Sequence, residues 1–338
     1  MAGWVFALGA GESPPTAGRD GLAYLFCAAV VAFLVLQSRG ERLLVDATAW
    51  LVAAAAVVIG GLLVLGVVSG GSIGSVEVWY HGARFRGWAT NPNQLALLIA
   101  PLPWLALAVR PVGAWRRRLQ RASAVALFGL GIATRSDALL VAWAVAAVSL
   151  TIWLVVSRAA LPTKSLRRAA VARLVVPLSL LLAGIVAGPA ATRWAEGRIV
   201  AAYGEGGQGS DRIARFGFGL DAVAASPVVG FGPGSFAGAT GAFGGHEAHN
   251  TPIDWAASTG MVGLAALALA CLWVLARCIR ARSPMATLAV VVLLLFMELH
   301  YVLRQPIAWF YLLAAAAVAE FYGRTKSGMS SHGIERPT

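Results

Sequence analysis

The chain has 338 residues, of which 59% are hydrophobic and 12% are charged. Roughly a quarter of the residues in soluble globular domains are charged, so this composition excludes that class and predicts a polytopic membrane protein. The formal net charge of +12 would suit a nucleic-acid-binding protein, but the positions of the basic residues argue against nucleic acid and favour anionic lipid headgroups as partners.

Apolar runs of about 20 residues recur along the chain, and a helix of that length crosses the hydrocarbon core of a bilayer. We therefore expect an all-α polytopic fold with about nine to ten transmembrane helices. In chain order, the expected spans are residues 21–38, 46–69, 93–109, 122–134, 138–156, 174–191, 257–276, 285–303 and 306–322.

Three short basic linkers set the expected orientation, because basic residues beside spans mark the cytoplasmic side. The linkers contain Arg110, Arg116, Arg117, Arg118 and Arg121, then Arg158, Lys164, Arg167, Arg168 and Arg173, and finally Arg277, Arg280 and Arg282. With these linkers inside, the chain begins outside and ends inside. The expected outer segments are then residues 70–92, 135–137, 192–256 and 304–305.

The outer segment 192–256 is long, and ordered loops of this length usually have a function. Within it, Ser210 is a candidate N-cap, and "DRIARFGFGLDAVAAS" (211–226) predicts a helix that ends before Pro227. Phe216 and Leu220 lie on the same face of this helix.

With Val223, these two residues form an apolar stripe at helical spacing. The stripe predicts an amphipathic helix that lies on the outer membrane surface. The glycine-rich stretch "GFGPGSF" (230–236) then predicts a tight turn.

Two outer segments carry paired arginines. "HGARFRGWATNPN" contains Arg84 and Arg86, and "GSDRIAR" contains Arg212 and Arg215 one helical turn apart. A guanidinium group stays charged and donates two hydrogen bonds at once to phosphate oxygens. These arginines therefore indicate a diphosphate ligand.

A third outer segment, "GGHEAHNTPIDWAASTG", gathers titratable side chains immediately before an apolar helix. It contains His246, Glu247, His249 and Asp254. A neutral histidine can take a proton from a hydroxyl because its ordinary pKa is near ambient pH. Beside arginines that hold a diphosphate, such a histidine suits group transfer from a lipid diphosphate. We interpret Asp254 as a helix cap, and His246 and Glu247 as solvated residues at the rim.

Three blocks in this order resemble the O-antigen ligase and O-antigen polymerase superfamily of bacterial cell-surface glycan assembly. They are "RFRGWATNPN", "DRIARFGFGLDAVAASPVVGFGPGSF" and "HNTPIDWAASTGMVGL". The matching positions are Arg84, Gly87, Pro92 and Asn93, then Arg212, Pro227, Gly230 and Gly232, and finally His249, Asn250, Gly260, Gly263 and Leu264. The resemblance covers residues 80–270.

The resemblance implies a GT-C-like, metal-independent, inverting glycosyltransferase of the bacterial inner membrane, with no cofactor and with its site facing the periplasm. Its donor would be a glycan linked to undecaprenyl diphosphate, and its acceptor a hydroxyl of lipid A–core or of a glycan. By position, Arg84 and Arg212 would bind the diphosphate, and His249 would act on the acceptor hydroxyl.

Seven further residues are candidates for supporting roles. Some of them have a second interpretation as anchors to lipid phosphates or as groups that reach the interface from the end of a span. Ionisable groups within a span indicate function by default. The seven residues are Arg86, Arg215, Asn250, Asn93, Glu298, His300 and Arg135.

The expected organisation has three parts. Residues 1–79 form N-terminal transmembrane helices, and residues 80–276 form the ligase-like core, which includes the outer loop 192–256. Residues 277–338 form the C-terminal helices and a basic cytoplasmic tail. A metal site is not expected, because no His-x-x-x-His pair lies on a helix and the outer segments hold no cysteine.

Several functions stay open from the sequence. A ligase moves a finished glycan to lipid A–core, a polymerase joins O-antigen or exopolysaccharide repeat units on the carrier, and a protein O-oligosaccharyltransferase uses a protein hydroxyl. The alternative from another class is a polytopic transporter or flippase, which predicts paired charges or broken helices within the membrane. The glycines at 60–61 and 129–131 keep this alternative open.

Overall fold

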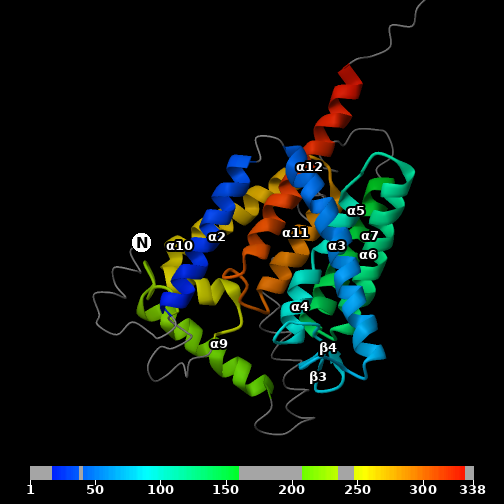
Figure 1. Cartoon of the computed structure of the whole chain (residues 1–338). Coiled ribbons are helices and arrows are strands. Elements are labelled where there is room, and N and C mark those ends of the chain that lie inside the picture. The colour runs from blue at the N-terminus through cyan, green and yellow to red at the C-terminus, as the bar shows by residue number, and fades with distance from the viewer. Residues whose placement is uncertain (1–16, 38–40, 160–207, 235–246, 332–338) are drawn as a thin grey trace, which may run out of the picture. The chain divides into compact units, whose positions relative to one another are not determined.

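The computed structural model describes residues 17–37, 41–159, 208–234 and 247–331, and these residues are mostly helical (Figure 1). The helices are α2 (Ala17–Gln37), α3 (Glu41–Val68), α4 (Pro92–Ile99), α5 (Leu102–Ala108), α6 (Ala114–Ala133), α7 (Asp137–Ala159), α9 (Gln208–Ala225), α10 (Thr251–Arg280), α11 (Pro284–Met297) and α12 (Pro306–Ser331). Within the described ranges, four helices are long and apolar enough to cross a membrane, namely α2, α3, α10 and α12. This agrees with the expected all-α membrane protein. The expected span 174–191 lies outside the described residues.

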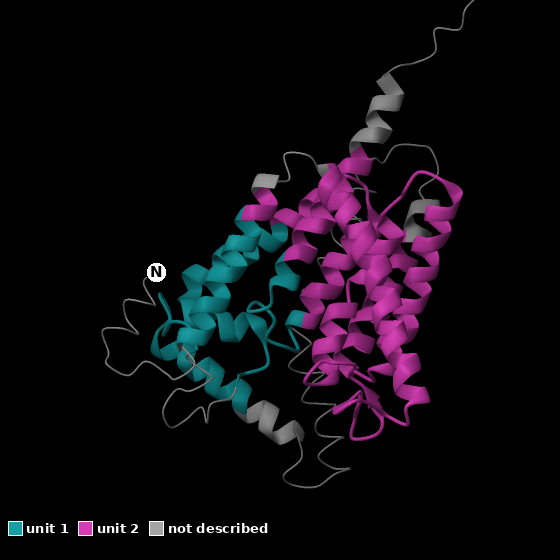
Figure 2. Cartoon of the chain, in the orientation of Figure 1, with its two compact units in different colours: residues 1–32, 178–272, 297–309 teal, residues 33–177, 273–296, 310–338 magenta. Residues whose placement is uncertain are grey.

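The chain divides into two compact units (Figure 2). Unit 1 contains residues 1–32, 178–272 and 297–309, and unit 2 contains residues 33–177, 273–296 and 310–338. Both units are assembled from segments that lie far apart in the sequence. The expected organisation into residues 1–79, 80–276 and 277–338 stays a prediction.

Unit 2 contains a helical core in which α3 packs against α5 and α6, and α4 packs against α6 and α7. Leu97, Leu105 and Leu127 are fully buried in this core. Their burial removes apolar surface from the exterior and holds the helices side by side. An edge-to-face row of aromatic rings, Trp104, Phe128 and Trp143, adds to the packing with centroid distances of 5.3 and 4.9 Å.

The expected span 93–109 corresponds to one apolar helical stretch, Pro92–Ala108, which is divided at Ala100–Pro101 into the short helices α4 and α5. Pro101 and Pro103 lack the amide donors that a continuous helix needs. Side chains donate to carbonyls at the interruption instead. Trp143 Nε1 donates to the Ala100 carbonyl at 2.9 Å, and the Tyr311 hydroxyl donates to the Leu98 carbonyl.

Two other boundaries differ from the prediction. Helix α6 begins at Ala114 rather than at residue 122, so Arg116 and Arg121 are helical rather than in a loop. Arginine is a good helix former, which explains the longer helix. Helix α11 ends at Met297, so the expected span 285–303 is too long at its C-terminal end.

Residues 70–92 contain two small antiparallel hairpins that the sequence analysis did not predict. β1 (Ser72–Ile73) pairs with β2 (Val76–Glu77), and β3 (Trp79–Tyr80) pairs with β4 (Arg84–Phe85). Strands of two residues are too short to produce a recognisable alternation of polar and apolar residues. The second hairpin places Arg84 opposite Tyr80.

Candidate functional site

Helix α10 of unit 1 is interrupted at Gly260, where φ is 69° and ψ is −175°. A Cβ atom at this position would lie 2.0 Å from the Val228 carbonyl oxygen. The backbone of residues 227–232 therefore passes directly against the interruption. Only glycine fits there, because of both the left-handed φ and the close approach.

The segment 227–232 satisfies the hydrogen-bonding groups that the interruption exposes. The amides of Phe231 and Gly232 donate to the carbonyls of Ala257 and Ser258 at 2.8 and 2.9 Å. In return, the Met261 amide donates to the Pro227 carbonyl at 2.7 Å. Buried backbone groups almost always require such partners.

These contacts explain the spacing in two of the sequence blocks. In the Pro-x-x-Gly-x-Gly turn, a Cβ atom at Gly230 would lie 2.5 Å from the backbone of Ser258. The turn of one block and the glycine of the other are therefore two halves of one interlocked structure. That structure fixes the loop end against the helix that begins just after His249.

Helix α9 leads into this turn. It begins at Gln208, so Ser210 lies within the helix and is not the N-cap that we expected. The helix ends before Pro227, as predicted. Its packed face is centred on Ala222 and Val223, which contact Ala257, while Leu220 of the predicted stripe is 49% exposed.

The first turn of α10 holds the His249 backbone in place. The Asn250 side chain caps the helix by accepting from the Ile253 amide at 3.0 Å. The Asp254 carboxylate reaches back and accepts from the amides of Ala248 and Asn250 at 2.9 and 3.3 Å. His249 lies between Ala248 and Asn250 and has a φ of 56°. This left-handed conformation costs about 1–3 kcal/mol in a non-glycine residue, so it needs the support of these hydrogen bonds.

The residues just after α11 are tied to the same turn. Asn250 Nδ2 donates to the backbone carbonyl of Glu298 at 2.8 Å and to its carboxylate at 3.3 Å. Thr251 Oγ1 donates to the His300 carbonyl at 2.5 Å and accepts from the Val302 amide at 3.2 Å. Glu298 and His300 thus lie after the helix rather than inside a span. Burial raises the pKa of the Glu298 carboxyl, and the Asn250 hydrogen bond opposes that rise.

The His249 imidazole faces groups of opposite charge on its two nitrogens. Its Nδ1 lies 3.9 Å from Glu247 Oε2, and its Nε2 lies 3.5 Å from an Arg215 guanidinium nitrogen. The His300 ring is 6.2 Å away between centroids. The side chain is 37% exposed, so the ring is accessible from outside the protein.

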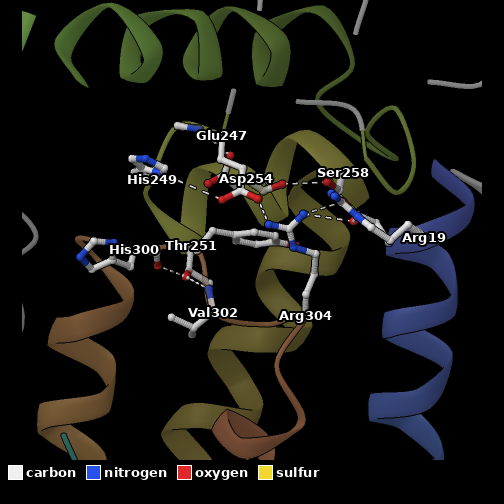
Figure 3. A network of polar contacts seen from close by, with 12 residues as sticks. Arg19, Glu247, His249, Thr251, Asp254, Ser258, His300, Val302 and Arg304 are labelled. Carbon is white, nitrogen blue, oxygen red and sulfur yellow. Dashed lines mark hydrogen bonds and ion pairs between the residues drawn. The ribbon is translucent and has the colours of Figure 1, made fainter. Parts of the chain in front are cut away.

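Glu247 is not the solvated rim residue that we expected. Its side chain is 19% exposed and forms an ion pair with Arg304. Figure 3 shows the Arg304 side chain extending toward Glu247 and Arg19. Arg304 also donates to both carboxylate oxygens of Asp20, at 3.1 and 2.9 Å. Asp20 comes from the first turn of α2 and is 3% exposed.

Arg304 and Asp20 are the two residues that the sequence analysis missed. Each carried a weak signal, since Asp20 is an acid at the start of a span and Arg304 lies in a short turn between two spans. Because both lie on the expected outer side and carry opposite charges, their pairing was a reasonable hypothesis. Nothing in the sequence indicated that they meet at Glu247.

In unit 2, Arg84 is held by neutral acceptors. Its Nε donates to the Thr134 carbonyl at 3.1 Å, and another guanidinium nitrogen donates to Asn93 Oδ1 at 3.1 Å. Among the described residues, no carboxylate forms an ion pair with Arg84. Its positive charge is therefore oriented but not neutralised, which suits an anionic ligand.

Arg86 differs from its neighbour, because it lies 3.8 Å from the Glu77 carboxylate and also donates to the Glu77 and Thr90 carbonyls. These contacts favour a structural role in the hairpin. Arg135 directly follows Thr134, is exposed and has a φ of 48°. Arg135 is therefore adjacent in sequence to Thr134, whose carbonyl accepts a hydrogen bond from Arg84.

The candidate residues fall into two groups. Unit 1 brings together His249, Asn250, Arg215, Glu298 and His300, and unit 2 brings together Arg84 and Asn93. Arg212 lies in α9 one turn before Arg215, but its side chain is outside the described ones, as is all of His246. That Arg84 meets His249 stays a prediction.

The described residues contain no group of three or more histidine, cysteine, aspartate or glutamate side chains that could hold a metal ion. What unit 1 offers is a partly exposed imidazole between an arginine and a carboxylate. A scan against protein-family models finds no match for this chain, and a search of curated proteins finds none.

Proposed function

We propose that this chain is a glycosyltransferase of the O-antigen ligase and polymerase superfamily. It transfers a glycan from undecaprenyl diphosphate to an acceptor hydroxyl at the periplasmic face of the bacterial inner membrane. The observation that carries the proposal is the His249 imidazole, which faces Arg215 on Nε2 and Glu247 on Nδ1. This arrangement suits a general base beside an anion.

In the proposed reaction, Arg215 moves from His249 Nε2 onto the diphosphate, and Nε2 takes the proton of the acceptor hydroxyl as its oxygen attacks the anomeric carbon of the donor. The bond from that carbon to the diphosphate oxygen breaks, and the electron pair leaves with the diphosphate. Attack opposite the leaving group inverts the anomeric carbon. The proton is finally released from the imidazolium to solvent.

The arginines stabilise the leaving diphosphate. Arg215 lies 3.5 Å from His249 Nε2, and Arg212 lies one turn away on the same helix. Arg84 of unit 2 carries a charge that no described carboxylate neutralises, and the resemblance assigns it to the diphosphate as well. Stabilisation of the developing negative charge is usually the largest contribution in such sites, so these arginines should matter as much as the base.

The ligase reaction, with lipid A–core as acceptor, is our preferred form of the proposal. A GT-C-like architecture and a metal-independent, cofactor-free reaction go with it. O-antigen or exopolysaccharide polymerisation and protein O-glycosylation use the same chemistry with a different hydroxyl. The choice among them depends on the acceptor that fits beside His249.

A transporter or flippase is supported less well. It would use interrupted helices whose free carbonyls coordinate an ion. The interruption in α10 is instead filled by the chain itself, because the Ala257 and Ser258 carbonyls accept from Phe231 and Gly232. Helices α3 and α6 run without interruption through the glycines at 60–61 and 129–131.

Reconstitution tests the proposal directly. The purified full-length protein in lipid nanodiscs is incubated with an undecaprenyl-diphosphate-linked glycan and lipid A–core, with EDTA present. The expected result is a new glycosidic bond and release of undecaprenyl diphosphate. Movement of the donor across a vesicle bilayer with no bond formed would favour the transporter instead.

Removal of the gene distinguishes the activities. Long glycan that accumulates on the lipid carrier indicates a ligase. Single repeat units on the carrier or on lipid A–core indicate a polymerase. Loss of glycan from proteins, with lipopolysaccharide unchanged, indicates protein glycosylation.

A further inference from the structure

Unit 1 contains a line of alternating charges that runs from the first turn of α2 to His249 (Figure 3). Asp20 accepts from one terminal nitrogen of Arg304, at 2.9 and 3.1 Å for its two oxygens. The other terminal nitrogen of Arg304 pairs with Glu247. The second oxygen of Glu247 lies 3.9 Å from His249 Nδ1.

The members of this line are largely buried, which strengthens the ion pairs between them. Asp20, Glu247 and Arg304 are 3%, 19% and 21% exposed. Charges removed from water pair more strongly than exposed ones, and a planar guanidinium can hold two carboxylates in fixed directions. Arg304 also stacks over the Tyr301 ring at 5.0 Å, which restrains its plane. These contacts restrain the orientation of the Arg304 guanidinium.

We propose that Asp20, Arg304 and Glu247 are positioning residues that together fix the orientation of the His249 imidazole. Asp20 fixes Arg304, Arg304 fixes the Glu247 carboxylate, and that carboxylate attracts the Nδ1 side of the ring from 3.9 Å. This inference rests on the proposed function, in which His249 Nε2 must face the acceptor hydroxyl. It gives helix α2, which lies outside the family-like blocks, a part in the reaction.

The charges around His249 determine how each member acts on proton transfer. Glu247 favours the imidazolium that forms when Nε2 takes a proton. Arg215 and Arg304 disfavour it, and Asp20 offsets the field of Arg304. Further charged or titratable groups that face this region are Arg19, which pairs with Asp20 at 2.9 Å, Asp254 on α10, and Glu298 and His300 after α11. Asp20 and Arg304 therefore shift the equilibrium between the neutral imidazole and the imidazolium of His249 in opposite directions.

Steady-state kinetics of the reconstituted protein test the proposal. Because a misplaced base loses rate rather than affinity, Arg304→Gln should lower kcat about 10–100-fold with the donor KM nearly unchanged. Asp20→Asn should lower kcat less, and Arg304→Lys should fall between wild type and Arg304→Gln because it keeps the charge but not the planar fork.

The pH profile separates positioning from simple loss of folding. The acidic limb of kcat should move to lower pH in Asp20→Asn, because the uncompensated Arg304 disfavours the imidazolium. It should move to higher pH in Arg304→Gln, because a cation near the ring is lost. Partial unfolding would lower kcat in both variants without moving the limb in opposite directions.

A second measurement does not need the activity. Diethyl pyrocarbonate modifies the neutral imidazole, so the pH dependence of His249 modification, read by peptide mass spectrometry, should shift in the same two directions. If wild-type protein transfers no glycan, the proposed function fails, but this measurement still tests the line of charges.

The matched control is the ion pair between Arg277 and Glu320 in unit 2, whose side chains are 39% and 17% exposed. Arg277→Gln should leave both kcat and the His249 modification profile at wild-type values. Wild-type kcat and an unshifted modification profile in both Asp20→Asn and Arg304→Gln would overturn the proposal. The proposal also fails if Arg277→Gln reproduces their shifts.

Discussion

Glycines lie inside helices in both units, but among the described helices only α10 is interrupted at one, Gly260 of unit 1. In unit 2, a Cβ atom added at Gly129 of α6 or at Gly61 of α3 would meet nothing within 4 Å. In unit 1, a Cβ atom at Gly260 of α10 would overlap the Val228 carbonyl. A glycine therefore breaks a helix where another segment supplies hydrogen bonds, and not through its own flexibility.

The units also differ in how they hold their candidate site residues. Arg84 of unit 2 is positioned by two neutral acceptors and keeps its charge available. His249 of unit 1 is surrounded by Glu247 and Arg215, and its backbone is held in a left-handed conformation. Arg84 thus keeps a charge that can attract an anion, whereas the His249 imidazole lies between a carboxylate and a guanidinium.

The largest expected effect is on the transfer rate and distinguishes two histidines with positive φ, His249 in unit 1 and His81 in unit 2. His249→Ala should lower the transfer rate about 10²–10⁴-fold, the usual contribution of a general base. His81→Ala removes an exposed turn side chain and should leave the rate within about twofold. Both rates are measured with purified protein in nanodiscs, and near-wild-type transfer by His249→Ala would refute its assignment as the base.

The next effect concerns stability and compares Gly260 with Gly129. Gly260→Ala combines a left-handed φ with a backbone overlap, so it should destabilise the protein by about 2–5 kcal/mol. Gly129→Ala should stabilise it by about 0.4–1 kcal/mol, because the unfolded chain loses freedom.

A thiol-reactive dye measures the thermal unfolding of both variants, because Cys27, Cys271 and Cys278 are buried and become accessible only on unfolding. Thermal unfolding in detergent should therefore show a lower Tm for Gly260→Ala and a slightly higher Tm for Gly129→Ala. Equal Tm changes in the two variants would contradict the difference between the units.

A smaller effect contrasts Arg84 with Arg86 within unit 2. Arg84→Lys loses the planar fork for a diphosphate, so the donor KM should rise about tenfold. Arg86 already faces Glu77, and Arg86→Lys should change the donor KM by less than about twofold. Donor titrations at constant acceptor concentration measure both. A larger rise for Arg86→Lys would place the diphosphate elsewhere.

The smallest expected effect is a pH dependence of the Tm that comes from Glu298 of unit 1. Burial raises the pKa of the Glu298 carboxyl above its ordinary value of 4.5, and the Asn250 hydrogen bond partly offsets this. A carboxyl with a raised folded pKa contributes stability that is fully present below its unfolded pKa and is lost as the pH rises through its folded pKa. The wild-type Tm should therefore fall relative to that of Glu298→Gln as the pH rises from below the ordinary carboxyl pKa to neutral.

Unit 2 supplies the comparison for this measurement. Glu320 pairs with Arg277, so Glu320→Gln removes an attraction and should lower the Tm at neutral pH. Opposite signs for the two glutamine variants are expected. A lower Tm for Glu298→Gln at neutral pH would mean that the Glu298 carboxylate is stabilising and would contradict the raised pKa.

Much of the helical organisation was predictable because it depends on local apolar composition. The runs that predicted spans at 21–38, 46–69, 138–156 and 306–322 correspond to α2, α3, α7 and α12. The helix before Pro227 was also predictable, since proline ends helices through its own geometry. Ser210 was misjudged because capping depends on where the helix begins, which tertiary contacts can move.

The polar contacts of the candidate site were predictable only in part. The block around His249 and Asn250 was identified, and the structure adds their partners Glu247, Arg215 and Glu298. The pairing of Asp20 with Arg304 joins residues 284 positions apart in the sequence. No spacing rule reaches that far, because the pairing is set by how the segments pack.

The interlock between residues 227–232 and α10 also constrains how this protein can evolve. Gly230 faces the backbone at Ser258, and Gly260 faces the backbone at Val228, so each glycine makes room for the other's segment. A substitution at one position would shift the very backbone that the other position accommodates. In a set of related sequences, the two positions should therefore be retained or replaced together, and single-site libraries would understate how strongly they depend on each other.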